Sequence, residues 1–449
     1  MNRHLKYLLR LKLSIAFGLL LSNVYGQETS TISIESSLKI AGANNLTISK
    51  LNLNKTVLEA DLLISKGWWI PELFAGIQTR QLQGAAMNGN GSFFTEVNQQ
   101  NLWNGVGIDA LWNIGEGIYK TKVSELKLEA NTYKTKAEKN IVLLEVADTY
   151  YQLLIGFLKT NAYHQLHTVA DNISQQLALQ VGVGLAYESE LLLAQSNVHH
   201  LKIQELNQQK YYYKKSAQLS RLLNLNPFNS LIPIDTILKP IELVNIDSLE
   251  NLDSLGNKRA EIQYAELLLK AVSTKKLTTT KAFFIPNIRF NSFGSLYGGL
   301  LGPVSLMPSS PGSEIKQLYP TTSMNFSLQW KIPIEKLIYN GPTKKIEASE
   351  KIQELEIQEI KAAINQDIAS AKQNLLIGNK QTELANKAYL QSKKAFNQCA
   401  KRQELGTIRP FELLQAQEIF IQSKLDYIEA IANYNTAQYA FQVASGINL

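Results

Sequence analysis

The chain has 449 residues, of which 45% are hydrophobic and 18% charged, and its formal net charge is +7. This length allows two or three domains, or one elongated fold built from repeats. The composition excludes wholesale disorder, and beyond the N-terminus no apolar run reaches the roughly 18 residues of a membrane helix. A single cysteine, Cys399, excludes a disulfide framework and a thiolate zinc cluster.

Residues 1–26 have the organisation of a secretory signal peptide. Basic residues precede a short apolar core at Leu13–Leu21, and Val24 and Gly26 are the small residues expected before a cleavage site. We expect cleavage before Gln27 rather than a membrane anchor, because so short a core cannot cross a bilayer of about 30 Å as a helix. Cleavage removes four of the 45 basic residues and leaves 41 against 38 acidic ones, a net charge of +3. The basic character of the whole chain is therefore no argument for nucleic-acid binding.

The first half of the mature chain contains two predicted strands, at about 68–78 and 102–112. Apolar residues occur at alternating positions in the second of them, which is the period of a strand with one apolar face. Each segment has about 11 residues, which suits a tilted transmembrane strand. The stretch between them, 79–100, is rich in Gly, Asn and Ser and is expected to be an exposed loop.

A long helical hairpin is predicted at about 118–224. The segment contains no proline, and its apolar residues recur at helical spacing. Gly182 and Gly184 interrupt this pattern and predict the turn between the two helices. The first helix, at about 60 residues, would run about 90 Å, which is longer than one compact domain.

The second half repeats this order of elements after an expected linker at 227–255. Strands are predicted at about 283–293 and 324–334, and apolar and polar residues alternate along the whole of the latter. The stretch between them, 295–322, is expected to be a loop. A second helical hairpin is predicted at about 342–445, with its turn at Gly406 to Pro410.

The two halves share residues at a constant offset of 222 positions. Leu153-Leu154-Ile155-Gly156 recurs as Leu375-Leu376-Ile377-Gly378, and Gly184 recurs as Gly406. Because the same offset continues over more than 70 positions, it predicts an internal duplication. The repeats are expected at 27–226 and 256–449.

Aromatic residues gather at the ends of the four predicted strands, where the aromatic girdle of a membrane barrel would lie. They are Trp68, Trp69, Trp112, Phe283, Phe284 and Trp330. Four strands cannot close a barrel, since about eight are needed, and an open edge in lipid leaves backbone groups unsatisfied. The chain would therefore pool strands with copies of itself, giving eight strands from two copies or twelve from three. The alternative is two sheet hairpins packed on helices in a soluble α+β protein.

Segments in both halves carry a resemblance to a known family. They are Ala43–Leu46, Trp69–Pro71, Leu111–Gly117, Tyr150–Leu154, Val183–Leu185 and Leu191–Gln195, then Lys258–Glu261, Phe284–Pro286, Leu328–Trp330, Tyr339–Gly341, Gly406–Gln417 and Ala444–Gly446. In their order, spacing and twofold recurrence they resemble the TolC-like outer-membrane efflux proteins over essentially the whole mature length. This resemblance implies a mainly α fold with a transmembrane β-barrel, in which a trimer shares twelve strands and extends a helical tunnel into the periplasm.

The resemblance implies an outer-membrane channel that serves as the exit duct of a tripartite efflux or type I secretion system. Such a duct conducts passively and is not an enzyme. Its partners would be two further copies in a homotrimer, a periplasmic adaptor protein, an inner-membrane transporter and outer-membrane lipid, with no nucleic acid. The competing interpretation is a periplasmic coiled-coil adaptor or scaffold without a channel. That protein should show one helical hairpin between β-rich halves and an inner-membrane anchor.

The resemblance also assigns roles to particular positions. The tunnel tips that meet the adaptor correspond to Val183, Gly184, Leu185, Leu405, Gly406 and Thr407. Glu412 corresponds to the first of two acidic residues that ring the closed periplasmic entrance, and the second position is Gln415, so the ring would carry half the charge. The alternatives are turns without a partner and, for Glu412 as for its repeat counterpart Glu190, a solvated helix-surface residue.

Four histidines are candidate metal ligands. They lie at similar distances from the first predicted turn: His164, His167, His199 and His200. No acidic or cysteine partner completes a recognisable ligand spacing, so we expect no metal site. The sequence also lacks a phosphate-binding loop, a dinucleotide fingerprint and a nucleophile elbow, so neither a cofactor nor a catalytic residue is predicted.

Overall fold

The computed structural model describes residues 30–87, 90–235, 237–243, 256, 259–301, 318–334, 338–447 and 449. The expected signal peptide, residues 1–26, lies outside the described residues, as does the part of the expected linker at 244–255.

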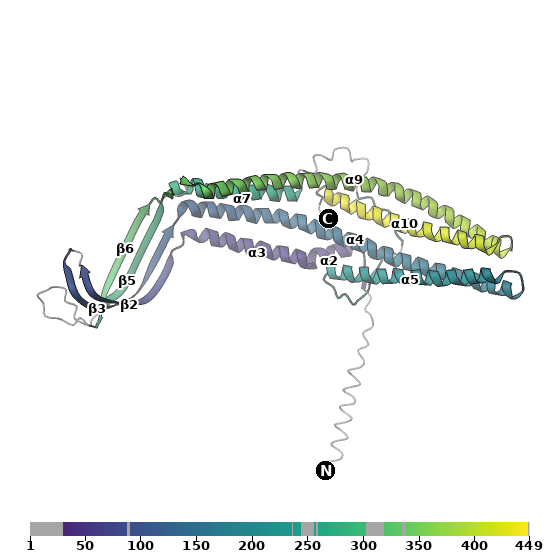
Figure 1. The fold of residues 1–449 in the computed structure, drawn as a ribbon, viewed down its shortest axis with the longest axis horizontal. Coiled ribbons are helices and arrows are strands. Elements are labelled where there is room, and N and C mark those ends of the chain that lie inside the picture. Colours follow the sequence, from purple (N-terminus) through teal and green to yellow (C-terminus); the bar gives the residue numbers. More distant parts are fainter. Residues whose placement is uncertain are drawn as a thin grey trace, which may run out of the picture. The chain divides into compact units, whose positions relative to one another are not determined.

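Long helices make up most of the described chain (Figure 1). The helices are α2 (Ile34–Asn44), α3 (Leu46–Lys66), α4 (Ile114–Gly182), α5 (Glu188–Leu222), α7 (Ala260–Thr280), α9 (Gly341–Glu404) and α10 (Pro410–Ala444). The strands are β1 (Ser30–Ile32), β2 (Glu72–Met87), β3 (Phe93–Trp112), β4 (Leu231–Pro233), β5 (Asn287–Leu301) and β6 (Tyr319–Gln329). Two short 3-10 turns, η1 (Gly67–Trp69) and η3 (Ala282–Phe284), precede β2 and β5.

The chain divides into two compact units, each of which draws on both halves of the sequence. The first unit comprises the chain up to Asn52, Lys134–Ile262 and Ile360–Leu449. The second comprises Leu53–Tyr133 and Gln263–Glu359. The units therefore cut across the predicted repeats at 27–226 and 256–449. The reason is that α4 and α9 are long enough to contribute to both units.

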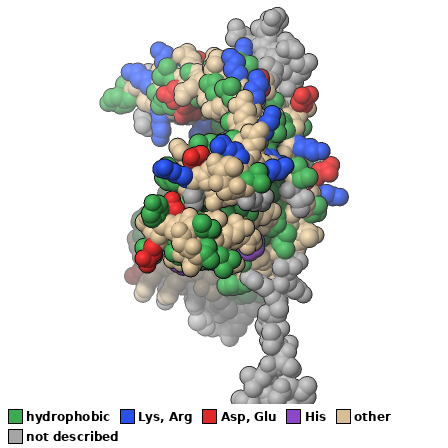
Figure 2. Space-filling view, turned by 90° about the vertical axis from the view of Figure 1, so that its right-hand side faces the viewer, with side chains coloured by type: hydrophobic (Ala, Val, Ile, Leu, Met, Phe, Trp, Pro, Cys, Tyr) green, Lys and Arg blue, Asp and Glu red, His purple; other side chains and the backbone are tan. Residues whose placement is uncertain are grey.

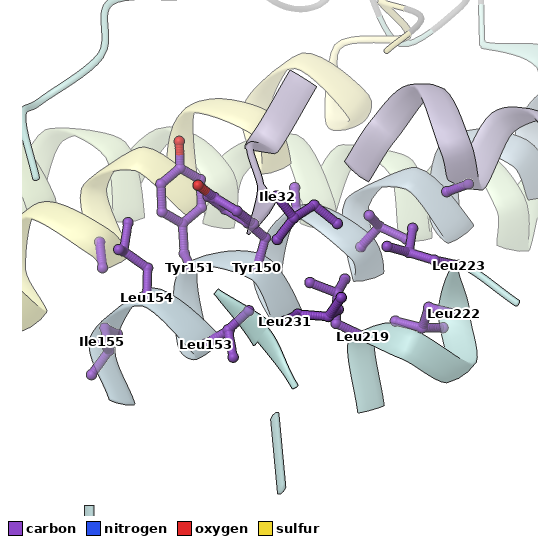
Figure 3. Close-up of a cluster of buried hydrophobic side chains, with 14 of the residues drawn as sticks. Ile32, Tyr150, Tyr151, Leu153, Leu154, Ile155, Leu219, Leu222, Leu223 and Leu231 are labelled. Atoms are coloured by element: carbon purple, nitrogen blue, oxygen red, sulfur yellow. The ribbon is translucent and has the colours of Figure 1, made fainter. Parts of the chain in front are cut away.

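The largest core cluster of the first unit lies between α4 and α5 (Figure 3). Tyr150, Leu153 and Leu154 of α4 and Leu219 of α5 are at most 1% exposed. Strand β1 pairs in parallel with β4, and Ile32 and Leu231 of these strands add to the same cluster. Each fully buried leucine stabilises the folded state by about 1.5–3 kcal/mol relative to exposure. The Tyr150–Leu154 motif of the sequence thus packs in this core.

Contacts in this unit recur at the 222-residue offset. Gly156 of α4 lies against Tyr212 of α5, and Gly378 of α9 lies against Tyr434 of α10. The Thr160 hydroxyl donates a hydrogen bond to the Gly156 carbonyl, and the Thr382 hydroxyl donates one to the Gly378 carbonyl. Shared side-chain contacts at one offset support the predicted duplication, because they require the same helix spacing in both hairpins.

The second unit contains an antiparallel sheet with the strand order β2-β3-β5-β6. The register pairs Leu73 with Ile108, Ile108 with Ser292, and Ser292 with Met324. The segments of α3, α7, α4 and α9 nearest to the strands complete the unit. Within the described chain, β2 and β6 form the two edges of this sheet.

The observed strands differ in extent from the predicted ones. Strands β2 and β5 begin about four residues later than expected, because the aromatic segments before Pro71 and Pro286 form the turns η1 and η3. Strands β2, β3, β5 and β6 also extend into the segments 79–100 and 295–322, which were expected to be loops. Residue composition misleads here because backbone pairing with a neighbouring strand outweighs the weak strand preference of Gln, Asn and Ser. Strand β6 ends at Gln329 rather than at residue 334.

Helix α4 is, among the described residues, the one helix long and apolar enough to cross a membrane by length and composition. The prediction that no apolar run of membrane-helix length follows the N-terminus is therefore wrong when judged by helix length and composition. However, 61% of the apolar 18-residue window is buried inside the protein. A core helix has the same composition as a membrane helix, so burial accounts for this stretch.

The paired contacts Gly156–Tyr212 and Gly378–Tyr434 yield a matched test. Alanine favours a helix by about 1 kcal/mol over glycine. A Cβ at residue 378 would lie 3.5 Å from the Tyr434 ring, an ordinary contact, whereas one at residue 156 would lie 3.0 Å from the Tyr212 Cα. We expect Gly378→Ala to raise the melting temperature measured by circular dichroism and Gly156→Ala to lower it. Equal shifts in the two variants would contradict this difference in packing.

Candidate functional site

The turn between α4 and α5 is closed by backbone hydrogen bonds. The Gly184 N–H donates to the Val181 carbonyl at 3.0 Å, and the Leu185 N–H donates to the Gln180 carbonyl at 2.8 Å. This pair of bonds is the Schellman motif, which satisfies the last carbonyls of a helix and requires a left-handed residue. Gly184 supplies that residue with φ +78°. The predicted turn thus has a defined backbone rather than a loose loop.

The turn between α9 and α10 has the same backbone. The Gly406 N–H donates to the Gln403 carbonyl and the Thr407 N–H donates to the Arg402 carbonyl, both at 2.9 Å. Gly406 has φ +66°, and the Thr407 hydroxyl adds a third bond to the Arg402 carbonyl at 3.0 Å. The two turns, which we call the tips, are 222 residues apart in sequence.

Apolar side chains project from both tips into solvent. Val183 is 71% exposed, Leu185 80% and Leu405 76%. Figure 2 looks onto this end of the first unit, and hydrophobic side chains reach its surface among basic and acidic ones. Beneath the tips, Ile173, Leu177, Ala194, Ile408 and Leu413 form a buried cluster. The exposed apolar residues of the tips therefore lie next to a well-packed hydrophobic cluster.

The two tips differ in charge. Residues 160–201 contain three acidic residues and neither lysine nor arginine, whereas the offset window 382–423 contains six basic and four acidic residues. Asp171, Glu188 and Glu190 are the acidic residues of the first window. The basic side chains of the second window include exposed Arg402 and Arg409. The duplicated backbone therefore presents two different electrostatic surfaces.

The predicted gate residues lie in the first turns of α10. Glu412 and Gln415 are both exposed. Glu412 is the third residue of its helix, where a carboxylate interacts favourably with the helix dipole. Its counterpart Glu190 holds the same position in α5, where Oε2 accepts a hydrogen bond from the Tyr187 N–H at 3.4 Å. Glu190 thus has a local capping role, whereas Glu412 is exposed.

A buried glutamine lies two residues beyond the predicted gate residue Gln415. Gln417 is fully buried, and its Nε2 donates to the Leu166 carbonyl of α4 at 3.4 Å. Its Oε1 has no hydrogen-bond partner among the described residues. The hydrogen bond to Leu166 connects α10 to α4 close to the predicted gate residues.

The histidines do not form a metal site in the described part of the chain. No group of three or more His, Cys, Asp or Glu side chains comes together there. The His164 Nδ1 lies 3.3 Å from Glu205 Oε1, and Lys202 Nζ lies 3.0 Å from both carboxylate oxygens. Burial would raise the pKa of Glu205, but the hydrogen bonds and charges of Lys202 and His164 outweigh it and lower that pKa. The group is thus an ion-pair network that connects α4 and α5.

The sheet of the second unit has two chemically different faces. The apolar face carries exposed hydrophobic side chains from β2, β3 and β6: Leu73, Ile77, Val106, Ile108, Met324, Phe326 and Leu328. The opposite face, which we call the polar face, carries Gln78, Arg80, Asp109, Asn291, Ser323 and Asn325. Leu73 is 81% exposed and Ile77 76%. A sheet with an exposed apolar face and a polar opposite face is typical of a membrane barrel wall.

Comparisons with known proteins identify the fold. No protein-family model matches the chain, and no curated protein matches it in sequence. Solved structures do match. The outer-membrane channel OprN has a TM-score of 0.73 at 15% identity, with 92% of this chain and 89% of that chain covered.

Two further structures are similar to the same extent. The CmeC outer membrane channel of Campylobacter jejuni has a TM-score of 0.74 at 15% identity and covers 92% of this chain and 85% of its own. The MtrE outer membrane channel of Neisseria gonorrhoeae, in its open state, has a TM-score of 0.70 at 14% identity, with coverage of 92% and 89%. The predicted resemblance is confirmed at the level of the fold: the chain has the fold of the TolC-like outer-membrane channels.

Proposed function

We propose that this protein is an outer-membrane channel and serves as the passive exit duct of a tripartite efflux or type I secretion system. The observation that carries the proposal is the sheet of the second unit. Its apolar face is exposed and its two edge strands, β2 and β6, lack partners within the described chain. A soluble protein would cover such a face.

Lipid accommodates the apolar face, but it does not accommodate the open edges. Each unsatisfied backbone group in the bilayer costs several kcal/mol. Pairing β6 of one copy with β2 of the next satisfies both edges and repeats around a ring. Three copies give twelve strands, which leave room for a passage, whereas two copies give eight and a filled interior. We therefore propose a homotrimer with its polar face lining the passage.

Exposed apolar residues on the long helices support association between copies. They are Leu192, Leu193, Ile203 and Leu206 on α5, and Ile352, Leu355, Ile377, Leu384 and Leu390 on α9. These helices are too polar to lie in lipid, so we place them on the periplasmic side of the barrel as a tunnel. Aromatic residues at the junction, including Trp69 and Trp330, are more than half exposed, as an interfacial girdle requires.

The tips supply a docking surface for a periplasmic adaptor protein. Exposed Val183, Leu185 and Leu405 stand on turns that are held by backbone hydrogen bonds. A preorganised apolar patch binds at a lower entropic cost than a flexible one. An inner-membrane transporter coupled to that adaptor would supply the energy for transport, because the chain has the features of a passive duct. A periplasmic scaffold without a channel leaves the exposed apolar face of the sheet unexplained.

The mass of the detergent-extracted mature protein tests the assembly. We expect a trimer in the outer-membrane fraction. Since each mature copy is lighter than the 50.3 kDa full chain, the protein mass should be about 140–150 kDa by light scattering with detergent correction. A soluble monomer would mean that the edges of the sheet do not pair between copies, and it would favour the periplasmic scaffold.

Substitution of the tip glycines tests docking. In Gly184→Val and Gly406→Val, a side chain must adopt a left-handed conformation that costs about 1–2 kcal/mol, although each site has open space. We expect both variants to assemble as trimers but to bind adaptor and export less. Gly182→Val is the matched control, since Gly182 also faces open space but has an ordinary helical backbone. Normal export by both tip variants would refute the docking role.

Charge removal at the gate tests the role of Glu412. Glu412→Gln should lower the cation-to-anion permeability ratio of the reconstituted channel by roughly twofold, because three copies lose three charges at a constriction. The matched control is Glu190→Gln at the equivalent position of the first repeat, which should leave the ratio unchanged. An equal ratio in wild type and Glu412→Gln would remove the gate assignment.

A further inference from the structure

Three aromatic side chains cluster on the polar face of the sheet. Phe74 of β2 and Trp103 of β3 stack with ring centroids 6.5 Å apart and planes at 24°. Phe293 of β5 meets Trp103 edge-on at 6.0 Å and 77°. We call these three residues the aromatic cluster. It lies within one unit of one chain and is formed by three neighbouring strands.

The strand register places the three rings on one face. Gly107 pairs with Phe74 on one side and with Phe293 on the other, and Trp103 lies four residues further along β3, on the same face. A Cβ on Gly107 would run into the Phe74 ring, and one on Gly76 would lie 3.6 Å from the Trp103 ring. Because Gly107 and Gly76 have no side chain, the Phe74 and Trp103 rings can lie close to the backbone of the sheet. A side chain at Gly107 would displace the Phe74 ring, whereas a Cβ at Gly76 would make an ordinary contact with the Trp103 ring.

The surroundings of the cluster carry charges of both signs. Two residues from Phe74 along β2 is Glu72, which is exposed and pairs in register with Asp109. Asp109 lies 3.7 Å from Arg289, and Arg80 lies on the same face beyond Trp103. The four charged residues therefore sum to zero, with the carboxylates at the Phe74 end of the cluster and Arg80 at the Trp103 end. In the proposed trimer, the passage would hold nine aromatic rings with a net negative charge at the Phe74 end of each cluster. The three rings are half-buried.

We propose that the aromatic cluster is a binding site for planar aromatic cations. Aromatic faces attract cations and stack with other rings, and Glu72 adds electrostatic attraction at the Phe74 end of the cluster. Assignment of such compounds as cargo rests on the proposed duct function, whereas the binding site itself needs only the sheet of one chain. If the rings only cover the glycine backbone, they will not bind an added ligand.

Equilibrium dialysis of the purified protein with ethidium tests the binding site. Tetrabutylammonium is the control probe because its charge can lie near a ring but it cannot stack, so it should bind roughly tenfold more weakly. Trp103→Leu keeps an apolar side chain but removes the ring, and we expect a roughly tenfold loss of ethidium affinity. Trp103→Phe should restore part of that loss. Phe326→Leu, the same kind of change on the apolar face, should have no effect.

Two results would overturn the proposal: equal binding of the two cations, or equal ethidium affinity in wild type, Trp103→Leu and Phe326→Leu. Phe293→Leu provides a second variant if Trp103→Leu does not fold, and it should also lose affinity. Conductance of the reconstituted protein separates this inference from the duct function. If the protein conducts but does not bind ethidium, the duct function stands and the binding site is refuted. If it binds ethidium through Trp103 but does not conduct, the binding site stands and the duct function is refuted.

Discussion

The proposed assembly depends on the backbone groups along the two edges of one four-stranded sheet. Strand β2 has 16 residues and β6 has 11, and neither has an outer neighbour within the described chain. In water such edges can be solvated, but the exposed apolar face of the same sheet favours lipid. This combination supports the proposed closed ring of copies, in which lipid contacts the apolar face and the edge strands pair between copies. The proposed passage and its polar lining follow from that closure.

The two predicted repeats share their buried contacts and turn backbones but differ in their exposed charges. Contacts inside the helical hairpins recur at the same offset, as at Gly156 with Tyr212 and Gly378 with Tyr434. The backbone of the two tips also recurs, because a helix end must satisfy its last carbonyls in either copy. Exposed positions have no such restriction. The acidic first tip and the basic second tip could therefore diverge in charge without cost to the fold.

The candidate sites could be found from the sequence to different degrees. The tip glycines were predictable because glycine between two long helical patterns marks a left-handed turn. The aromatic cluster was not, since Phe74, Trp103 and Phe293 are far apart in the chain and only strand register brings them together. Alternation within one strand shows which residues share a face, but not which residues of the next strand lie opposite. The buried contact of Gln417 with α4 was hidden for the same reason.

The sequence by itself determined the local elements: proline-free helical segments, alternating strands, two glycine turns and their repetition at a constant offset. These features depend on residues close together in the chain, so periodicity and turn chemistry suffice to predict them. Tertiary structure alone decided the strand limits, the strand order β2-β3-β5-β6, the pairing of β1 with β4 and the division into units. Each of these depends on contacts between distant segments, where hydrogen bonding and packing outweigh local preference.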